Sequence, residues 1–411
     1  MRITTDLAGY LGNQITAVSR GGLPIIAWKI SLFVQLILAV PIVLLVRLLR
    51  PLWLVRFRPL SNRMGQFVGS TELYLCQRDL GMHDGRILDL FYFLRTIPNR
   101  FVKKKWQQQL HVYFFVYALD RMNKMIPGGR KHIIPMPEVR DLDGLMEKTE
   151  IHFTFTQEEE EKGQALLRKY GVPEGAPLIC FQARDPSYLL ERSGLPGFYD
   201  YHDYRDSDIT TYLMAADRLT ELGYYALRMG AIVDRDARSA NPNVIDYSTF
   251  HRNEFMDIYL SARCSFYLVD TAGMSAVAAT FRRPLAFVNY APLENVQTWR
   301  EETLTILKKH WLRHEERYMT FREILESGAG LFFAVAKFQE MGIDLHDNTP
   351  EEIAAVALEM EARTSGTWET TQEDEDLQRR FWSLFKPSDW NREFRSRIGS
   401  QFLRENPYLL D

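Results

Sequence analysis

The sequence predicts an α/β protein of two doubly wound domains, preceded by a hydrophobic helix that associates with a membrane. Three observations lead to this prediction. The chain has 411 residues, and a single core stops growing at roughly 250–300 residues, so two compact domains are expected. Strand-like and helix-like segments alternate, as in parallel βαβ units. Near the N-terminus, 17 consecutive residues, Ile30–Val46, carry no charge.

The uncharged segment could meet a membrane in several ways. As a helix it would be about 25 Å long, slightly short of the roughly 30 Å hydrocarbon core of a bilayer. It lies too far along the chain for a secretory signal peptide, and Pro41 would kink or break it. A short spanning helix, a re-entrant helix, an interfacial helix and a buried core helix all stay open. The arginines that follow favour phospholipid head groups and a cytoplasmic downstream domain: Arg47, Arg50, Arg56, Arg58 and Arg63.

Charge divides the chain into a basic first part and an acidic remainder. Residues 1–150 hold 21 Lys and Arg against 11 Asp and Glu, a net charge of +10, while the whole chain has -3 and the remainder therefore -13. A basic region attracts an anionic partner such as phospholipid, lipid diphosphate or nucleic acid. No nucleic-acid-binding module is visible, so an anionic membrane surface is the predicted partner. The basic aromatic stretch Asn99–Gln109 is expected to rest on it.

The elements expected after the hydrophobic segment follow in order. Strands are predicted at 52–60 and 87–95, helices at 66–76 and 99–110, and a third apolar run covers 111–126. From residue 150 the alternation becomes more regular. Predicted strands lie at 151–156, within 176–185, and at 224–230, 243–248, 265–269 and 284–290. Predicted helices lie at 157–172, 208–223, 253–263 and 274–281, from their apolar spacing and end signals.

These elements predict four regions. They are a membrane-associating segment at 1–55, an N-terminal domain at 56–150, a C-terminal domain at 151–365, and an acidic linker with a C-terminal helix at 366–411.

Polar residues follow four strands of the C-terminal domain, where the strands enter their loops. If these strands are parallel, the loops lie on one edge of the sheet, where ligands of such sheets bind. A helix start there suits a phosphate, and an arginine can clamp a diphosphate. Plain structural roles stay open, since Arg184 can pair with an acid, Asp270 or Thr271 can cap a helix, and Ser275 can pack. The residues predicted at this site are Arg184, Tyr188, Arg228, Gly230, Asp270, Thr271 and Ser275.

Several classes of chemistry lack their signatures. The three cysteines are odd in number and far apart in the sequence, which argues against disulfides and for a reducing compartment. No glycine-rich dinucleotide motif follows a strand, and no phosphate-binding GxxxxGK[ST] motif occurs. Asp141 and Asp143 match the letters of a metal-binding acidic pair but are interpreted as a polar loop. Neither a metal nor a cofactor is expected.

Several stretches together resemble a bacterial family of GT-B glycosyltransferases, many of them linked to surface polysaccharide assembly. They are "CFQARDPSY", "YRDSDITTYLMAADRLTELGYYALRMGA", "FYLVDTAGMSAVAATFRRPLAFVNYAP" and "IGSQFLRENPYLL". The resemblance covers roughly residues 58–411 and is most specific in 178–292. It implies two Rossmann-like domains facing a cleft. It also implies that the C-terminal domain, with the seven residues above, holds a nucleotide-sugar donor.

The resemblance leaves the catalytic base open. Related transferases often carry a usable His in the loop after the first strand, but here that loop has Gln66, which cannot take a proton at neutral pH. The candidates are Glu72, Asp79, His83 and Asp84.

The resulting hypothesis is a metal-independent glycosyltransferase at the cytoplasmic face of the inner membrane, acting on a lipid-linked or membrane-bound acceptor. A sugar-nucleotide epimerase or hydrolase, and a catalytically silent scaffold of a polysaccharide assembly complex, are the alternatives.

Overall fold

The computed structural model of the chain describes residues 27, 30–83, 85–193, 200–386, 388 and 391–411. Asp84, one of the candidate bases, lies outside them. The described residues fall into two compact units. The first takes residues from Met1–Asn62, Gly81–Ile97 and Lys103–Met136, and the second from Arg63–Leu80, Pro98–Val102 and Pro137–Asp411. The units interleave along the chain, whereas the predicted regions are continuous segments, and the predicted boundaries stay a prediction.

The first unit is built on two parallel strands, β1 (Leu54–Leu60) and β2 (Ile87–Phe93), paired along their whole length. Both lie within their predicted ranges. The third apolar run supplies α4 (Val116–Met125), followed by the 3-10 turn η2 (Gly129–His132). Among the described residues this sheet has two strands and isolated bridges, so a doubly wound N-terminal domain stays a prediction.

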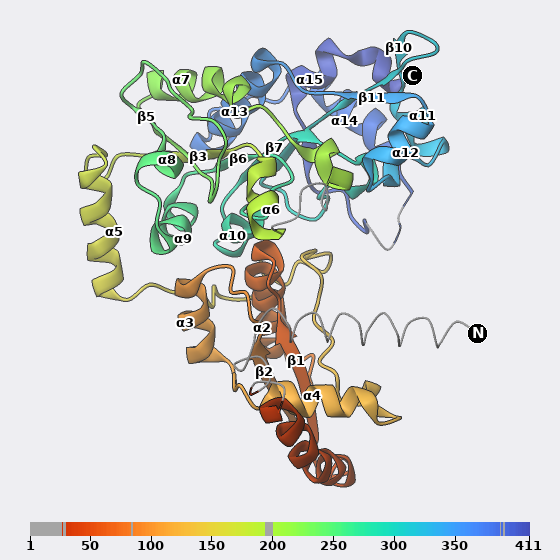
Figure 1. Cartoon of the computed structure of the whole chain (residues 1–411). Helices are drawn as coiled ribbons and strands as arrows, with labels where there is room; N and C mark the ends of the chain where they lie inside the picture. Colours follow the sequence, from red (N-terminus) through yellow and green to blue (C-terminus); the bar gives the residue numbers. More distant parts are fainter. Residues whose placement is uncertain (1–26, 28–29, 84, 194–199, 387, 389–390) are drawn as a thin grey trace. The chain divides into compact units, whose positions relative to one another are not determined.

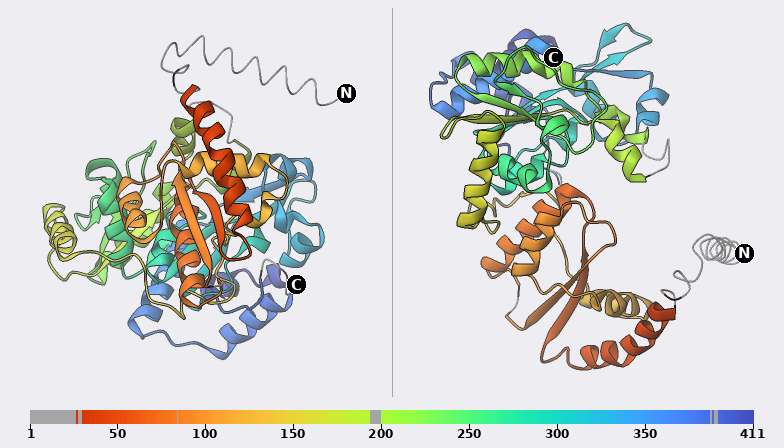
Figure 2. Two further views of the ribbon diagram at one scale, coloured as in Figure 1. Left: turned by 90° about the horizontal axis from the view of Figure 1, so that it is seen from below. Right: turned by 60° about the vertical axis from the view of Figure 1, so that its left-hand side comes forward.

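The hydrophobic segment forms one continuous helix, Ile30–Leu48, and Pro41 does not break it. Ala39 and Val43, one turn apart on this helix, are buried in a small core of the first unit that includes Val116 and Leu119 of α4. The helix lies beside α4 in both views of Figure 2. Within an 18-residue stretch of this helix, only 11% is buried. One stripe of the helix therefore packs against the first unit, and the remaining apolar side chains face outward.

The last turn of this helix is fixed to the end of α4 by Arg47. Its guanidinium donates hydrogen bonds to the carbonyl oxygens of Asn123, Ile126 and Pro127, at 2.8, 3.0 and 2.7 Å. A cation at a helix C-terminus satisfies carbonyl groups that have no partner inside the helix. The helix is therefore held along the surface of the first unit as far as Arg47.

The second unit contains a seven-stranded parallel sheet in the order β12-β8-β7-β6-β3-β4-β5. The strands are short, and their residues are almost all buried, as expected for a sheet covered on both faces. Their bounds are β3 Leu178–Gln182, β4 Tyr225–Arg228, β5 Val244–Ile245, β6 Tyr267–Val269, β7 Leu285–Tyr290, β8 Thr303–Leu307 and β12 Arg397–Ile398. The predicted parallel sheet is confirmed.

Helices cover both faces of this sheet. In Figure 1, α7 (Leu213–Glu221) and α13 (Pro350–Ser365) lie on one face, and α9 (Glu254–Arg263) and α10 (Ser275–Thr280) on the other. Further helices and turns are η1 Gln66–Ser70, α2 Thr71–Asp79, α5 Gln157–Lys169, α6 Pro186–Ser193, η3 Asp200–Arg205, η4 Ile209–Tyr212, α8 Tyr247–Phe250, α11 Phe321–Glu326, α12 Val335–Glu340 and α15 Ser400–Glu405. A three-stranded antiparallel sheet joins β9 Lys309–Leu312, β10 Arg317–Tyr318 and β11 Ile343–His346.

Two predictions about local structure are wrong. Residues 151–156 form no strand, because their alternating phenylalanines pack into an aromatic cluster instead. The acidic linker is largely a helix, α14 (Gln372–Ser383), whose acids occupy a capped first turn while Leu377 and Phe381 are buried. The stretch Asn99–Gln109 contains the whole of α3 (Arg100–Gln109). Its Lys105 and Trp106 are buried, and contact of this stretch with a membrane stays a prediction.

Candidate functional site

The strand order creates a point where the chain reverses direction across the sheet. From β3 the chain moves outward through β4 and β5, then returns to place β6 on the other side of β3. When the loops after two neighbouring strands run in opposite directions, a crevice forms at the carboxyl ends of these strands. Open parallel sheets bind their ligands in such a crevice. The loops after β3 and β6 carry Arg184 and Asp270, two of the residues predicted for the site.

Asp270 joins these two loops. Its carboxylate is fully buried, and its Oδ2 accepts a hydrogen bond of 2.5 Å from the backbone N–H of Arg184. Burial raises the pKa of Asp270 to about 6, against the opposing effects of the Arg184 N–H and of the Arg205 and Arg184 charges. The helix that follows begins after Met274, without a side-chain cap. The alternative in which Asp270 or Thr271 caps the helix is therefore wrong, and Asp270 instead fixes the crevice.

Arg205, which was not among the predicted site residues, contacts the same loop. It ends the 3-10 helix η3, and its Nε donates to Thr271 Oγ1 at 2.8 Å, while Nη2 donates to the Thr271 carbonyl. Burial, followed by the nearby charge of Arg184, lowers the pKa of Arg205. Two guanidinium groups thus lie close together in a partly desolvated place. Such an arrangement is favourable chiefly when an anion, such as a phosphate, binds there.

Arg184 is balanced by an internal acid. Its Nη1 donates to Asp206 and to the His202 carbonyl, the latter at 3.1 Å. Burial raises the pKa of Asp206 to about 7, although Arg184 opposes this effect. Asp206 therefore loses much of its charge near neutral pH. Hydrogen bonds among the described residues occupy two of the five N–H donors of each guanidinium, Arg184 and Arg205.

Small residues bring two backbones together beside the loop. The side chain of Ser275 bonds to the Ala272 carbonyl at 2.8 Å, which fixes the loop after β6. A Cβ added to Gly273 would lie 3.4 Å from the backbone nitrogen of Gly65, at the start of η1. The π-helix η1, with Gln66 as its first residue, is thereby placed against the Asp270–Gly273 loop within the second unit.

Arg228 and Gly230 have mainly structural contacts. The buried guanidinium of Arg228 donates to Asp246 at 3.2 Å and to Ser248 at 2.7 Å. These bonds leave it little freedom to clamp a diphosphate. Gly230 packs beside it, since a Cβ there would lie 2.7 Å from Val233. The side chain of Tyr188, on α6, lies outside the described residues.

A pocket of about 380 Å³ opens at the same edge of the sheet. Carboxylates predominate around it, and one of them is Asp206, the partner of Arg184. Its charged lining residues are Asp185, Asp206, Asp208, Asp234, Asp347, Arg228 and Arg235. Behind it, buried Lys308 pairs with Asp347 at 2.6 Å. Carboxylates accept hydrogen bonds from hydroxyl groups, so the pocket suits a sugar or a ribose, while the arginines beside it suit phosphate.

The candidate bases are dispersed. Glu72 and Asp79 lie on α2 in the second unit, where both contact His152. Arg282 also pairs with Glu72, at 2.9 Å. His83 lies in the first unit, and burial, followed by Arg56, lowers its pKa. None of the contacts described for these residues involves the Asp270–Gly273 loop, and the roles of the four candidate bases stay predictions.

No family model matches the chain, and no curated protein matches it. Solved structures of glycosyltransferases are similar to it at low scores. ADP-heptose lipopolysaccharide heptosyltransferase II of E. coli is 13% identical with a TM-score of 0.37, over 62% of this chain and 90% of its own. A family 9 glycosyl transferase of Veillonella parvula is 10% identical with a TM-score of 0.42, over 75% and 96%. Likeness this distant carries no argument, so function rests on the residues above.

Proposed function

We propose that this chain is a GT-B type glycosyltransferase that moves a sugar from a nucleoside-diphosphate sugar to an acceptor hydroxyl. One observation carries the proposal. The backbone N–H of Arg184 and the side chain of Arg205 bond to the loop at the reversal point of a parallel sheet, and Asp206, which pairs with the Arg184 guanidinium, is one of the carboxylates that line the pocket at this edge. The arginines would bind the diphosphate, and the carboxylates would bind hydroxyl groups of the ribose or the sugar. A nucleotide sugar carries both kinds of group, a diphosphate and rings that bear hydroxyl groups.

The chemistry follows from where charge develops. When the sugar–phosphate bond breaks, negative charge gathers on the departing diphosphate. Fixed guanidinium groups in a partly buried site stabilise this charge without reorganising. Metal independence is part of the proposal, because Arg184 and Arg205 can supply the positive charge. The acceptor hydroxyl must lose its proton to a base, for which Glu72, Asp79, His83 and Asp84 stay candidates.

Nucleoside diphosphates test the proposal directly. The full chain is heated with ADP, UDP, GDP, CDP or TDP, and with the matching monophosphate and free nucleoside. We expect one diphosphate to raise the unfolding temperature, because a ligand at 100 times its Kd adds about 2.7 kcal/mol to stability. The monophosphate and nucleoside should have much smaller effects. If no diphosphate has any effect, the protein does not bind this donor class, and the scaffold alternative is favoured.

An assay of the nucleotide sugar separates the two enzyme classes. A transferase consumes the sugar nucleotide that matches the bound diphosphate only when an acceptor is present. An epimerase or hydrolase would convert the free sugar nucleotide, and would do so even after removal of residues 1–55.

We further propose that the N-terminal helix is interfacial and anchors the first unit to the cytoplasmic face of the inner membrane. Ala39, Val43 and Arg47 hold it along α4, which is difficult to combine with a full crossing. Its outward side chains include Phe33, Leu38 and Leu45, which are 64, 61 and 54% exposed. Phe114, just before α4, is 83% exposed. Apolar side chains at one surface, with basic residues nearby, are typical of helices that lie in the head-group region.

Substituting an outward-facing leucine tests the membrane proposal. We expect Leu45→Asp to abolish most binding of the full chain to vesicles of 30% anionic phospholipid in sedimentation, because a charge would enter the apolar layer. Leu222→Asp is the matched control, since Leu222 is 53% exposed in the second unit, and it should bind like wild type. Equal binding by both variants would contradict an anchor in this helix. In sealed vesicles that carry the protein, a protease added on the side of the C-terminus should also remove an epitope placed at the N-terminus. A spanning helix would put that epitope on the other side of the membrane and protect it.

A further inference from the structure

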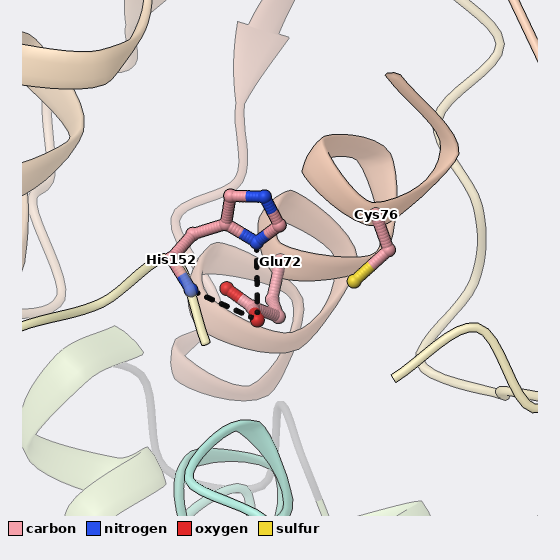
Figure 3. A group of neighbouring side chains, drawn as sticks. All are labelled: Glu72, Cys76 and His152. Atoms are coloured by element: carbon pink, nitrogen blue, oxygen red, sulfur yellow. Dashed lines mark hydrogen bonds and ion pairs between the residues drawn. The ribbon is translucent and has the colours of Figure 1, made fainter. Parts of the chain in front are cut away.

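A cluster of potential metal ligands lies on one face of α2. Glu72 and Cys76 are one turn apart and fully buried, and His152 lies opposite them (Figure 3). One ligand atom from each of the three residues lies within 4.8 Å of the other two. All three belong to the second unit. A metal ion could bring these atoms to coordination distance with small side-chain movements.

The histidine is oriented as metal-ligating histidines usually are. Its Nε2 is 2.8 Å from Asp79 Oδ2, one further turn along α2. Its Nδ1 is directed toward Glu72, with 3.3 Å to Oε1 (Figure 3). A carboxylate that holds one ring nitrogen fixes the tautomer and leaves the other nitrogen for a metal. The Thr149 hydroxyl lies 3.0 Å from Cys76 Sγ and can donate to a thiolate.

A second observation concerns the carboxylate of Glu72. Glu72 Oε2 is buried and has no hydrogen-bond partner among the described residues. A buried carboxylate oxygen without a partner is costly, and a bound cation would satisfy it. Arg282 already donates to the other oxygen, Oε1, at 2.9 Å. Arg282 opposes a cation. Once His152 and Cys76 have lost their protons, however, the carboxylates of Glu72 and Asp79, the Cys76 thiolate and Arg282 together leave a charge of -2, which a divalent ion balances.

We propose that Glu72, Cys76 and His152 bind a divalent transition metal ion, with Asp79 orienting the histidine. One sulfur, one nitrogen and one carboxylate ligand suit zinc. Zinc takes four ligands, so the fourth position would be occupied by water. The ion would connect α2 to the segment that contains His152. This site is separate from the proposed donor pocket, none of whose lining residues it shares.

A proton competes with the metal at this site. Burial lowers the pKa of His152, but bonds to Cys76, Glu72 and Asp79 outweigh it and raise the pKa to about 10. A metal ion must displace this proton and the thiol proton, because ligands bind deprotonated. The measurements therefore belong at pH 8 or above.

Metal content of the full chain tests the proposal. The protein, incubated with zinc at pH 8 and dialysed, should retain one zinc per chain. The double variant Cys76→Ser/His152→Gln should retain none, and Asp79→Asn should bind about 10–100-fold more weakly. The matched control is Cys264→Ser, since Cys264 is another buried free cysteine, and it should keep its zinc. Wild-type protein without zinc, or a double variant that keeps it, would overturn the proposal.

Cobalt titration keeps the test decisive if the variants do not fold. Cobalt(II) bound by a thiolate gives a charge-transfer absorption band. This band is measured on the wild-type protein, so the test does not depend on any variant. We expect this band to appear at one equivalent of cobalt and to disappear when zinc is added. A titration at pH 8 without a thiolate band would overturn the assignment of Cys76. Diphosphate binding is measured on the same samples, so failure of the metal proposal is distinguishable from failure of the proposed function.

Discussion

Arg205→Ala is expected to weaken nucleoside-diphosphate binding by roughly 10- to 150-fold. One charge-assisted hydrogen bond to the diphosphate would be lost, which contributes about 1.5–3 kcal/mol, and 1.4 kcal/mol corresponds to a tenfold change in Kd. Thr271 would also lose the bonds that Arg205 donates to its side chain and carbonyl. Isothermal titration of the full chain with the diphosphate selected by the thermal screen measures the effect. Arg205→Lys should restore only part of the affinity, because a lysine lacks the planar set of donors.

Arg218→Ala is the control for this prediction. Arg218 lies on α7, is 59% exposed and pairs only loosely with Glu221, at 3.4 Å. Its removal should leave the affinity unchanged. If Arg205→Ala binds the diphosphate as tightly as wild type while both variants remain folded, the diphosphate does not lie at the Asp270–Gly273 loop.

The geometry of the sheet edge could be predicted because it follows from local patterns. Buried apolar runs separated by helices indicate parallel strands, and parallel strands put their following loops on one edge. The pattern therefore predicts that Arg184, Asp270, Thr271 and Ser275 lie near one another. Their roles depend on partners that the pattern does not give. Asp270 has the appearance of a helix cap, yet the helix begins five residues later, at Ser275.

Two arginines show why the partners could not be predicted. Arg228 ends a strand, as a ligand-binding residue would, but Asp246 after the next strand neutralises it. Arg205 ends a short 3-10 helix within a long connection, where no periodicity indicates which way a side chain points. One sequence feature could have indicated Arg205 as a site residue: an Arg-Asp pair occurs at 205–206, as it does at 184–185. Contacts between loops distant in the sequence decide both cases.

The C-terminal region shows a different limit. A run of acids from Glu373 to Asp376 suggests a solvated linker, but acids are also favoured in the first turn of a helix. The apolar residues that distinguish the two, Leu377 and Phe381, follow one turn apart. The short strand β12, which completes the edge of the sheet, has two residues, too few for any pattern.

Asp270→Ala is expected to destabilise the second unit by about 2 kcal/mol, whereas Asp270→Asn should not. The alanine variant leaves the buried N–H of Arg184 without its acceptor, and a buried unsatisfied donor costs about 1–3 kcal/mol. An asparagine keeps an oxygen at the same place and removes a charge that is costly to bury. Urea unfolding of the full chain, followed by circular dichroism, compares the two variants with wild type.

The pH dependence provides an independent check on the same residue. The folded pKa of Asp270, about 6, lies above the ordinary aspartate pKa of 3.8, so the folded state holds the proton more tightly than the unfolded state. Wild-type stability from this group is therefore greatest at low pH and falls as the pH rises through the folded pKa. Relative to wild type, Asp270→Asn should gain about 1 kcal/mol between pH 5 and pH 7.5, since one pKa unit corresponds to 1.36 kcal/mol. If the difference between the two proteins does not change with pH, Asp270 is ionised throughout this range. The carboxylate would then be stabilised by Arg184 and Arg205 more strongly than burial destabilises it, and a diphosphate would have to compete with Asp270 for both arginines.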